Sequence, residues 1–293
     1  MVHMTLSHQN EIMVVSGAST GMGAATAPEL ATRGYHILAG VRRERDGDAI
    51  RADGIEPVIL DLTQPEHLRA LVDRIASDPD HRPLRALINN AGIAINAPVE
   101  ALPLDEWRRQ FDVNLFGHIA VTQALLPFLH QSHGRIVNIS SVGGKIAMAT
   151  YGAYAGAKFA LEAASDSLRR ELAPHGVQVV VVEPGAVKTE MADRGAATAN
   201  DLAGRMNHEQ QRRYGGRVKA IVAQQAAFTR TGLPADKAGS IIAEAATARR
   251  PRTRYTIGRD AALMTRLARI LPDRILDRVF AANLRLHLPK EGA

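Results

Sequence analysis

Two side chains suited to acid–base chemistry, Tyr154 and Lys158, lie four residues apart in this sequence. Residues at this spacing share one face of a helix. A free phenol has a pKa of about 10 and is a poor base at neutral pH. A neighbouring ammonium stabilises the phenolate and lowers that pKa, so the pair could give a proton to a substrate oxygen or take one from it. The same spacing also occurs by chance in surface pairs, and the prediction therefore depends on the motifs around it.

Ser141 supports the prediction for Tyr154 and Lys158. It follows the strand-like run Arg135–Ile139 and precedes the helix expected to carry Tyr154. In a parallel sheet, the end of one strand and the start of the helix that follows it are close in space. The hydroxyl of Ser141 could therefore hold the substrate oxygen that Tyr154 protonates. Ser141 and Tyr154 are thus predicted to bind substrate as well as to act in catalysis.

A glycine-rich turn follows the first strand-like run, Ile12–Val15, and opens a helix. Glycines at such a turn let a pyrophosphate approach the backbone, and the helix N-terminus faces the phosphates with its positive end. We expect the turn to bind a dinucleotide, with hydroxyl donors from two of its residues, Ser19 and Thr20. No Lys-Ser or Lys-Thr pair follows, so the turn is not a nucleotide-hydrolysing P-loop. Its predicted binding residues are Gly17, Ser19, Thr20, Gly21, Met22 and Gly23.

The end of the second strand-like run indicates which dinucleotide is bound. A site that prefers NAD has an acidic residue there to bind the ribose hydroxyls, whereas this sequence has Val41 followed by Arg42 and Arg43. Guanidinium groups match a 2′-phosphate by bidentate hydrogen bonds. We therefore expect NADP(H) rather than NAD(H). The alternative is a solvated basic turn, since Glu44 and Asp46 are also nearby.

Two further strand ends carry candidate cofactor contacts. Asp61, followed by Leu62, could accept a hydrogen bond from the adenine amino group or could cap the helix expected near Pro65. The segment Asn89–Gly92 has small residues against which a ribose could lie, and its asparagines could join adjacent strand ends. We expect binding from Asp61, Leu62, Asn90, Ala91 and Gly92.

Short hydrophobic runs alternate with amphipathic stretches along most of the chain, which predicts a parallel sheet covered by helices on both faces. The expected fold is α/β, a single doubly wound Rossmann-type sheet of about seven strands. The expected strands are Ile12–Val15, His36–Val41, Pro57–Leu60, Ala86–Ile88, Arg135–Ile139, Val177–Val182 and Arg254–Ile257. The expected helices are Met22–Arg33, Pro65–Ser77, Leu104–Leu129, Tyr154–Ala173 and Ala235–Thr247.

The C-terminal third departs from this pattern. Residues 187–233 are rich in Ala, Gly, Arg and Gln without a strand pattern, and predict mobile helical turns. Beyond residue 258, apolar residues recur at helical spacing with an interruption at Pro272. This tail could pack on the body or on a second subunit, cover the substrate, or lie on a membrane surface. We expect one domain over 1–293: a core at 10–258 with a substrate-loop insertion at 188–233, and a helical extension at 259–293.

Composition excludes several function classes. The absence of cysteine excludes disulfides, thiolate metal sites and a cysteine nucleophile, and no metal site is expected. The net charge of +6 is spread along the chain, and the aromatic content of 4% is too low for a base-stacking surface, so we expect no nucleic-acid partner. The polar segment Met1–Asn10 lacks a signal-peptide core, and no run is long enough to span a membrane. We therefore expect a cytoplasmic protein, with weak peripheral membrane contact through 260–283 at most.

Taken together, these motifs and their order resemble the short-chain dehydrogenase/reductase family over residues 10–258. The motifs are Gly17-x-x-x-Gly21-x-Gly23, Asn89-Asn90-Ala91-Gly92, Asn114, Ser141, Tyr154-x-x-x-Lys158 and Pro184-Gly185. Ser16 stands where the family usually has threonine. A methyltransferase shares the glycine-rich turn but would leave Arg42, Ser141 and the Tyr154–Lys158 pair unexplained.

The resemblance implies a catalytic tetrad of Asn114, Ser141, Tyr154 and Lys158. Hydride would pass from NADPH to a carbonyl carbon while Tyr154 donates the proton. Lys158 would bind the nicotinamide ribose and, with Asn114, hold a water that relays protons. Tyr154 and Lys158 are accordingly also expected to contact the cofactor. Tyr151 has no lysine four residues later, so it is expected to line the substrate pocket.

The family pattern also gives expectations for cofactor, substrate and assembly. Pro184, Gly185, Val187 and Thr189 are expected to bind the nicotinamide end. The extended tail resembles members that act on retinoids, steroids or other lipophilic ketones, aldehydes and alcohols. Helices 104–129 and 154–173 would form the interface of a homodimer or homotetramer. The alternative function is a non-catalytic NADP-binding sensor or scaffold, against which the intact tetrad argues.

Overall fold

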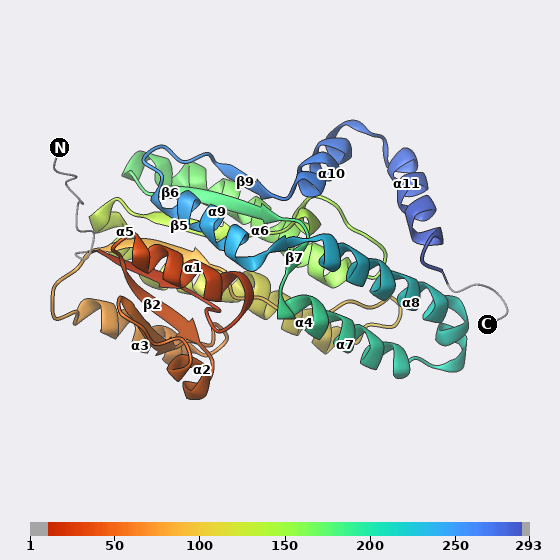
Figure 1. Cartoon of the computed structure of the whole chain (residues 1–293), viewed down its shortest axis with the longest axis horizontal. Coiled ribbons are helices and arrows are strands. Elements are labelled where there is room, and N and C mark those ends of the chain that lie inside the picture. Colours follow the sequence, from red (N-terminus) through yellow and green to blue (C-terminus); the bar gives the residue numbers. More distant parts are fainter. Residues whose placement is uncertain (1–10, 289–293) are drawn as a thin grey trace.

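The computed structural model describes residues 11–288; the expectations for Met1–Asn10 and for residues 289–293 lie outside this range. A seven-stranded, fully parallel sheet has the strand order β3-β2-β1-β4-β5-β6-β9 (Figure 1). Its strands are β1 (Ile12–Val15), β2 (His36–Val41), β3 (Ile55–Ile59), β4 (Leu84–Asn89), β5 (Arg135–Ile139), β6 (Gln178–Pro184) and β9 (Arg254–Ile257). The expected doubly wound fold is confirmed, and four of the seven strands have the expected bounds.

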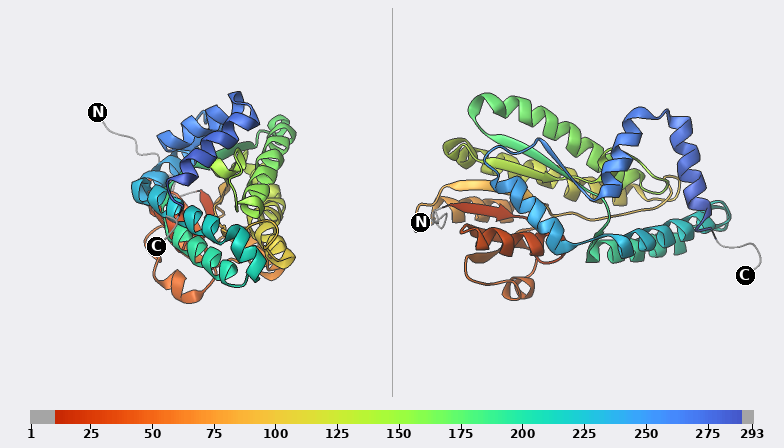
Figure 2. Two further views of the ribbon diagram at one scale, coloured as in Figure 1. Left: turned by 90° about the vertical axis from the view of Figure 1, so that its right-hand side faces the viewer. Right: turned by 45° about the horizontal axis from the view of Figure 1, so that its top comes forward.

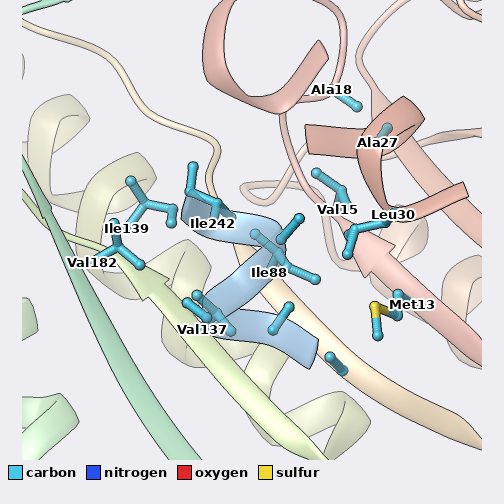
Figure 3. Close-up of a cluster of buried hydrophobic side chains, with 14 of the residues drawn as sticks. Met13, Val15, Ala18, Ala27, Leu30, Ile88, Val137, Ile139, Val182 and Ile242 are labelled. Atoms are coloured by element: carbon cyan, nitrogen blue, oxygen red, sulfur yellow. The ribbon is translucent and has the colours of Figure 1, made fainter. Parts of the chain in front are cut away.

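Both faces of the sheet are covered by helices, as the uninterrupted hydrophobic runs predict. Alternate residues of β1 point into opposite cores: Met13 and Val15 into one, Ile12 and Val14 into the other. The first core lies under α1 (Gly21–Thr32) and α9 (Ala235–Thr247), and Figure 3 shows part of it. The second core lies under α3 (Pro65–Ala76), α5 (Gly117–Ser132) and α6 (Gly152–Leu172).

The helix expected over 104–129 is not continuous. It divides into α4 (Leu104–Phe111), one π-helical turn at Asp112–Phe116, and α5. Asn114 lies inside the π turn, and its side-chain amide is bonded to the backbone of Ile93. A π turn widens the helix by one residue locally and is common at functional sites. Apolar periodicity cannot distinguish it from α-helix, because the pattern continues through it.

Residues 187–233 are mainly helical, as expected, but they form two long helices rather than short turns: α7 (Glu190–Gly204) and α8 (His208–Thr231). The expectation that the segment contains no strand is wrong. A capping box between Asn207 and Gln210 starts α8. Two short strands at the ends of the segment, β7 (Val187–Lys188) and β8 (Leu233–Pro234), pair in parallel. Residues 187–233, called the excursion below, thus leave the rest of the domain and rejoin it at one place.

A further short helix, α2 (Glu44–Asp48), follows β2 and was not predicted.

The C-terminal extension forms two helices separated at Pro272, as predicted: α10 (Arg259–Ile270) and α11 (Asp273–Arg285). Together they form an arch that starts at the end of β9 and returns to α8 (Figures 1 and 2). A 2.5 Å hydrogen bond from Gln224 of α8 to Asn283 closes the arch. Among the described residues, no helix is both long and apolar enough to cross a membrane.

Candidate active site

The glycine-rich turn between β1 and α1 has the geometry that a dinucleotide cradle needs. Gly17 and Gly21 have φ values of +66° and +59°, which favour glycine. At Gly23 a Cβ atom would lie 2.2 Å from the carbonyl oxygen of Gly17 and 2.5 Å from the amide nitrogen of Asn90. Each glycine is therefore required by conformation or by a close approach, and the open backbone fits a pyrophosphate at the start of α1.

The carboxyl ends of β1 and β4 are joined where the strand order reverses. Asn90 donates from its side chain to the carbonyl oxygens of Ser16 and Gly17, at 3.0 and 3.1 Å. The Ser16 hydroxyl in turn accepts from the backbone N–H groups of Asn90 and Ala91, both at 3.0 Å. Serine thus makes these contacts in place of the family's usual threonine. Ligands of doubly wound sheets bind at this reversal.

The two arginines after β2 have different surroundings. Arg43 is held by Asp46 through two hydrogen bonds of 2.8 and 3.1 Å. Arg42 is exposed and, among residues 11–288, forms no ion pair within 4.0 Å. It lies close enough to Asp61 to help lower the pKa of that carboxyl group. Of the two, Arg42 has the guanidinium that is free to bind a phosphate.

Asp61 is engaged with its own turn. Its Oδ1 accepts from the N–H of Thr63 at 3.0 Å and from the Thr63 hydroxyl at 2.7 Å. Partial burial opposes ionisation, but these hydrogen bonds outweigh it and hold the pKa of Asp61 below its usual value. Gln64, rather than Asp61, is the N-cap residue of α3. Leu62 beside it is buried in the second core.

Tyr154, Ser141 and Lys158 lie together where β5 ends and α6 begins. Tyr154 and Ser141 lie side by side, since a Cβ on Gly143 would lie 3.0 Å from the Tyr154 ring and 3.4 Å from Ser141 Oγ. Ser141 Oγ accepts from the N–H of Gly143 at 3.0 Å. Burial raises the pKa of the Tyr154 phenol, and the neighbouring Ser141 hydroxyl acts in the opposite direction. The lowering of this pKa expected from Lys158 is not seen. The Nζ of Lys158 donates at 2.7 Å to the carbonyl oxygen of Ile139.

Lys158 is buried, with an exposed fraction of 5%. Burial lowers the pKa of its ammonium to about 8, and the carboxylate of Glu162, one turn further along α6, opposes this change. Glu162 itself is held by Lys145 at 2.7 Å and by Arg254 at 2.8 Å. The lysine therefore remains mostly charged at neutral pH while lying in a nearly dry environment.

Asn114 fixes the loop that follows β4. Its Oδ1 accepts from the N–H of Ile93, and its Nδ2 donates to the carbonyl oxygen of Ile93, both at 2.9 Å. A Cβ on Gly92 would lie 3.5 Å from Oδ1 of Asn114. Asn114 thereby connects the π turn to the segment expected to bind the cofactor ribose.

Tyr151 lies beside Tyr154, with their rings edge to face and the centroids 6.1 Å apart. Its hydroxyl donates to Gln225 of α8 at 2.6 Å. Burial raises the pKa of this phenol well above its ordinary value, so Tyr151 stays protonated. The contact with α8 places Tyr151 between the catalytic candidates and the excursion, which is where a substrate-lining residue is expected.

The nicotinamide-end residues lie where β6 passes into the excursion. Pro184 ends β6, and the N–H of Gly185 donates to Ile257 at 2.8 Å. Val187 is buried in β7. Thr189 is the N-cap residue of α7, and a Cβ on Gly21 would lie 3.1 Å from its side chain. This end of the segment therefore packs against the glycine-rich turn, as a shared cofactor site requires.

Sequence reasoning missed three residues near the site. Gln225 lies on α8, whose position beside Tyr151 has no local signal in the sequence. Gln110 is fully buried one turn before Asn114 and bonds to the backbones of Ile93 and Ile95. His118 is buried one turn after Asn114. It bonds to the carbonyl oxygen of Ala91 at 2.7 Å. Gln110 and His118 lie four residues before and after Asn114, and this helical spacing was visible in the sequence.

Comparisons with known proteins show the family to which the chain belongs. A family model described as short chain dehydrogenase matches residues 11–200. Retinol dehydrogenase 5 of Mus musculus is 36% identical over 287 residues, covering 94% of this chain and 89% of that protein. The 3-amino-tetrahydro-pyrrolizinone reductase of Xenorhabdus hominickii is 35% identical over 269 residues, covering 92% and 94%.

The fold comparison gives the same result. The crystal structure of a short-chain dehydrogenase from Streptomyces avermitilis superposes with a TM-score of 0.72 at 26% identity, covering 93% of this chain and 94% of that one. The chain belongs to the short-chain dehydrogenase/reductase family. It is an oxidoreductase that acts on CH–OH groups and uses a nicotinamide cofactor.

Proposed function

We propose that this enzyme reduces the carbonyl group of a lipophilic ketone or aldehyde with NADPH, using Tyr154 as the acid. The observation that carries the proposal is the juxtaposition of the buried Tyr154 phenol and the Ser141 hydroxyl, with Lys158 one turn along the same helix. When bound, the nicotinamide supplies the hydride. A phenol whose pKa is raised by burial stays protonated at neutral pH, and this favours proton donation, which is the reductive direction.

Each member of the tetrad has a role that follows from its surroundings. The Ser141 hydroxyl holds the substrate oxygen next to the Tyr154 phenol. Lys158 places a positive charge below the phenol, so that it stabilises the phenolate formed when the proton leaves. Lys158 and the backbone beside Asn114 hold the water through which Tyr154 regains its proton. The Asn114 side chain keeps the Ile93 loop in place, because both of its polar atoms bind there.

The preference for NADPH rests on Arg42. A 2′-phosphate is doubly charged near neutral pH and is bound well by an unpaired guanidinium. Arg42 is exposed beside Asp61 at the adenine end, while Arg43 is held by Asp46. The side chain of Val41 has no carboxylate to bind the ribose hydroxyls, so the contact that would favour NADH is absent.

The lipophilic substrate class is supported by the residues near Tyr154. Ile93 and Met191 are half-buried on the loop after β4 and on α7, and a Cβ on Gly92 would lie 3.5 Å from Met191. Tyr151 adds an aromatic wall whose hydroxyl is occupied by Gln225. The curated relative named retinol dehydrogenase supports the same class.

Two assembly features complete the proposal. Phe116 and Phe159 are 56% and 44% exposed on the helices expected to form a homodimer or homotetramer. The extension exposes Leu263 and Ile270 among several arginines, which suits weak peripheral contact of a cytoplasmic enzyme with an anionic membrane. Phe159→Asp should shift the sedimentation coefficient to that of a monomer, and removal of 260–293 should abolish any binding to anionic vesicles.

The reaction is tested by NADPH oxidation against a panel of ketones and aldehydes of increasing apolar size. We expect kcat/KM to rise with apolar surface, and NADPH to be oxidised faster than NADH at equal concentration. Tight NADPH binding without turnover of any carbonyl would support the non-catalytic sensor instead. Equal turnover of small polar and large apolar carbonyls would contradict the lipophilic substrate class.

A further inference from the structure

The start of α7 lies across the edge of the sheet where the dinucleotide is expected. Thr189, the N-cap residue of α7, packs against Gly21 of the glycine-rich turn. Two turns along, Gly195 packs on the loop after β4, where a Cβ on Gly195 would lie 3.3 Å from the Cβ of Ala94. The first turns of α7 are therefore fixed at both the glycine-rich turn and the loop after β4.

Arg194 lies between these two contacts and reaches back to the glycine-rich turn. Its Nη2 donates to the hydroxyl of Thr20 at 3.1 Å. Thr20 is the N-cap residue of α1, and its side chain caps no N–H of that helix. Within the described part of the chain, no carboxylate lies within 4.0 Å of the Arg194 guanidinium. An exposed arginine without an ion-pair partner is thus held at the N-terminus of the helix that should receive the pyrophosphate.

We propose that Arg194 binds the pyrophosphate of the dinucleotide beside the N-terminus of α1. This inference rests on the proposed cofactor. A guanidinium forms bidentate, charge-assisted hydrogen bonds with phosphate oxygens, which a hydroxyl alone cannot supply. Arg194 would close α7 over the bound nucleotide, so that the excursion is ordered against the cofactor when the nucleotide binds.

Arg194 and Arg42 would then have separate tasks. The pyrophosphate is common to NADH and NADPH, whereas the 2′-phosphate is present only in NADPH. Arg194 should therefore add affinity for both nucleotides equally, while Arg42 sets the preference between them.

Glu190 provides an independent reason why a cation is needed at this point. Its carboxylate lies on α7, with Oε2 3.8 Å from the position of a Cβ on Gly21. A negative charge at this distance from the glycine-rich turn repels the pyrophosphate. Arg194, one turn further along the same helix, offsets that repulsion.

The test compares Arg194→Met with a matched control, Arg205→Met. Both changes remove one guanidinium from α7 and keep an unbranched stem, but Arg205 pairs with Asp201 at the far end of the helix. Binding is measured by titration calorimetry with two probes. ADP-ribose contains the pyrophosphate, whereas adenosine 2′-monophosphate contains only the adenine end and the 2′-phosphate.

Arg194→Met should weaken ADP-ribose binding by about tenfold or more, as expected for the loss of a charge-assisted contact. It should leave the binding of adenosine 2′-monophosphate unchanged, which also shows that the variant is folded. The NADPH-to-NADH affinity ratio should stay at the wild-type value, and Arg205→Met should match the wild type throughout. Glu190→Gln should tighten ADP-ribose binding.

Wild-type affinity of Arg194→Met for ADP-ribose would overturn the proposal, as would equal losses for both probes. A wild-type protein that binds neither NADPH nor ADP-ribose would instead overturn the proposed cofactor. The two failures are therefore distinguishable from the same set of titrations.

Discussion

The Nζ of Lys158 donates a 2.7 Å hydrogen bond to the carbonyl oxygen of Ile139, the last residue of β5. This bond ties the first turns of α6 to the carboxyl end of β5. Since Ser141 follows Ile139 by two residues and Tyr154 precedes Lys158 by one helical turn, the same bond brings Ser141 and Tyr154 together. The proton-transfer pair is thus positioned by the sheet itself rather than by a loop.

Arg42→Ala should weaken NADPH binding and leave NADH binding unchanged. Loss of charge-assisted bonds to a phosphate costs about 1.5–3 kcal/mol, which corresponds to about a 10- to 100-fold change in Kd. Fluorescence titration with both nucleotides measures the change. Arg43→Ala serves as the comparison and should have a smaller effect, because Asp46 already occupies that guanidinium. Equal losses for NADH and NADPH in Arg42→Ala would contradict the assigned role.

Asn114→Ala should destabilise the protein as well as slow the reaction. The change removes both hydrogen bonds to Ile93 and leaves its N–H without a partner, while its carbonyl oxygen keeps the bond from Gln110. A polar group that loses its partner costs about 1–3 kcal/mol, so the free energy of unfolding should fall by about that amount. Urea denaturation measures this. A fall of less than about 0.5 kcal/mol, the range of ordinary surface substitutions, would contradict the structural role.

His118 should make the protein acid-sensitive between pH 7 and pH 5. Burial lowers the pKa of His118 to about 3, with the charge of Lys158 acting in the same direction. In this interval the unfolded chain binds a proton at His118 and the folded chain does not, so stability is greatest above the unfolded pKa and falls as pH decreases. The residue should account for a loss of about 2 kcal/mol by pH 5.

The comparison variant is His118→Gln, which keeps a donor for the carbonyl oxygen of Ala91. Its free energy of unfolding, measured in urea at pH 7, 6 and 5, should lack this loss. A change at the exposed His208, His208→Gln, should retain the wild-type pH dependence. If His118→Gln and the wild type lose the same stability on acidification, the buried, neutral state of His118 is wrong.

Gly23→Ala should abolish nucleotide binding, whereas Gly216→Ala should raise the stability of the protein. A Cβ at Gly23 would lie 2.2 Å from the Gly17 carbonyl oxygen, so the turn must open and nucleotide binding should be lost. At Gly216, in α8, nothing lies within 4 Å, and alanine should stabilise the helix by about 0.5–1 kcal/mol. Thermal unfolding and NADPH titration test the pair. Wild-type nucleotide affinity in Gly23→Ala would contradict the close-approach argument.

The sequence predicted the sheet well because each strand is buried on both faces, so its hydrophobic run is uninterrupted. β1, β2, β5 and β9 have the expected bounds for this reason. The π turn at Asn114 was not predictable from periodicity, since it differs from α-helix in its backbone hydrogen bonds, with the N–H of Gly117 bonded to the carbonyl oxygen of Asp112. The helices α7 and α8 were missed because much of their surface is polar and their partners are distant in sequence.

The candidate site was predictable where a local motif carries it and not where the fold brings distant residues together. The glycine-rich turn, Ser141, Tyr154 and Lys158 belong to the first kind. The contact of Tyr151 with Gln225 and that of Arg194 with Thr20 are brought about by the fold. Their partners are 74 and 174 positions apart in the sequence. The raised pKa of Tyr154 was also unforeseen, since burial raises it and the expected lowering by Lys158 is not seen.

Turnover of Tyr154→Phe is the most direct test of the account. The change removes only the hydroxyl, so NADPH affinity should stay near the wild-type value. The kcat for carbonyl reduction should fall by about 10²- to 10⁴-fold, the usual contribution of a positioned acid. Tyr151→Phe, at the neighbouring tyrosine, should lower kcat far less. Unchanged turnover of Tyr154→Phe with NADPH and a carbonyl substrate would show that Tyr154 is not the acid.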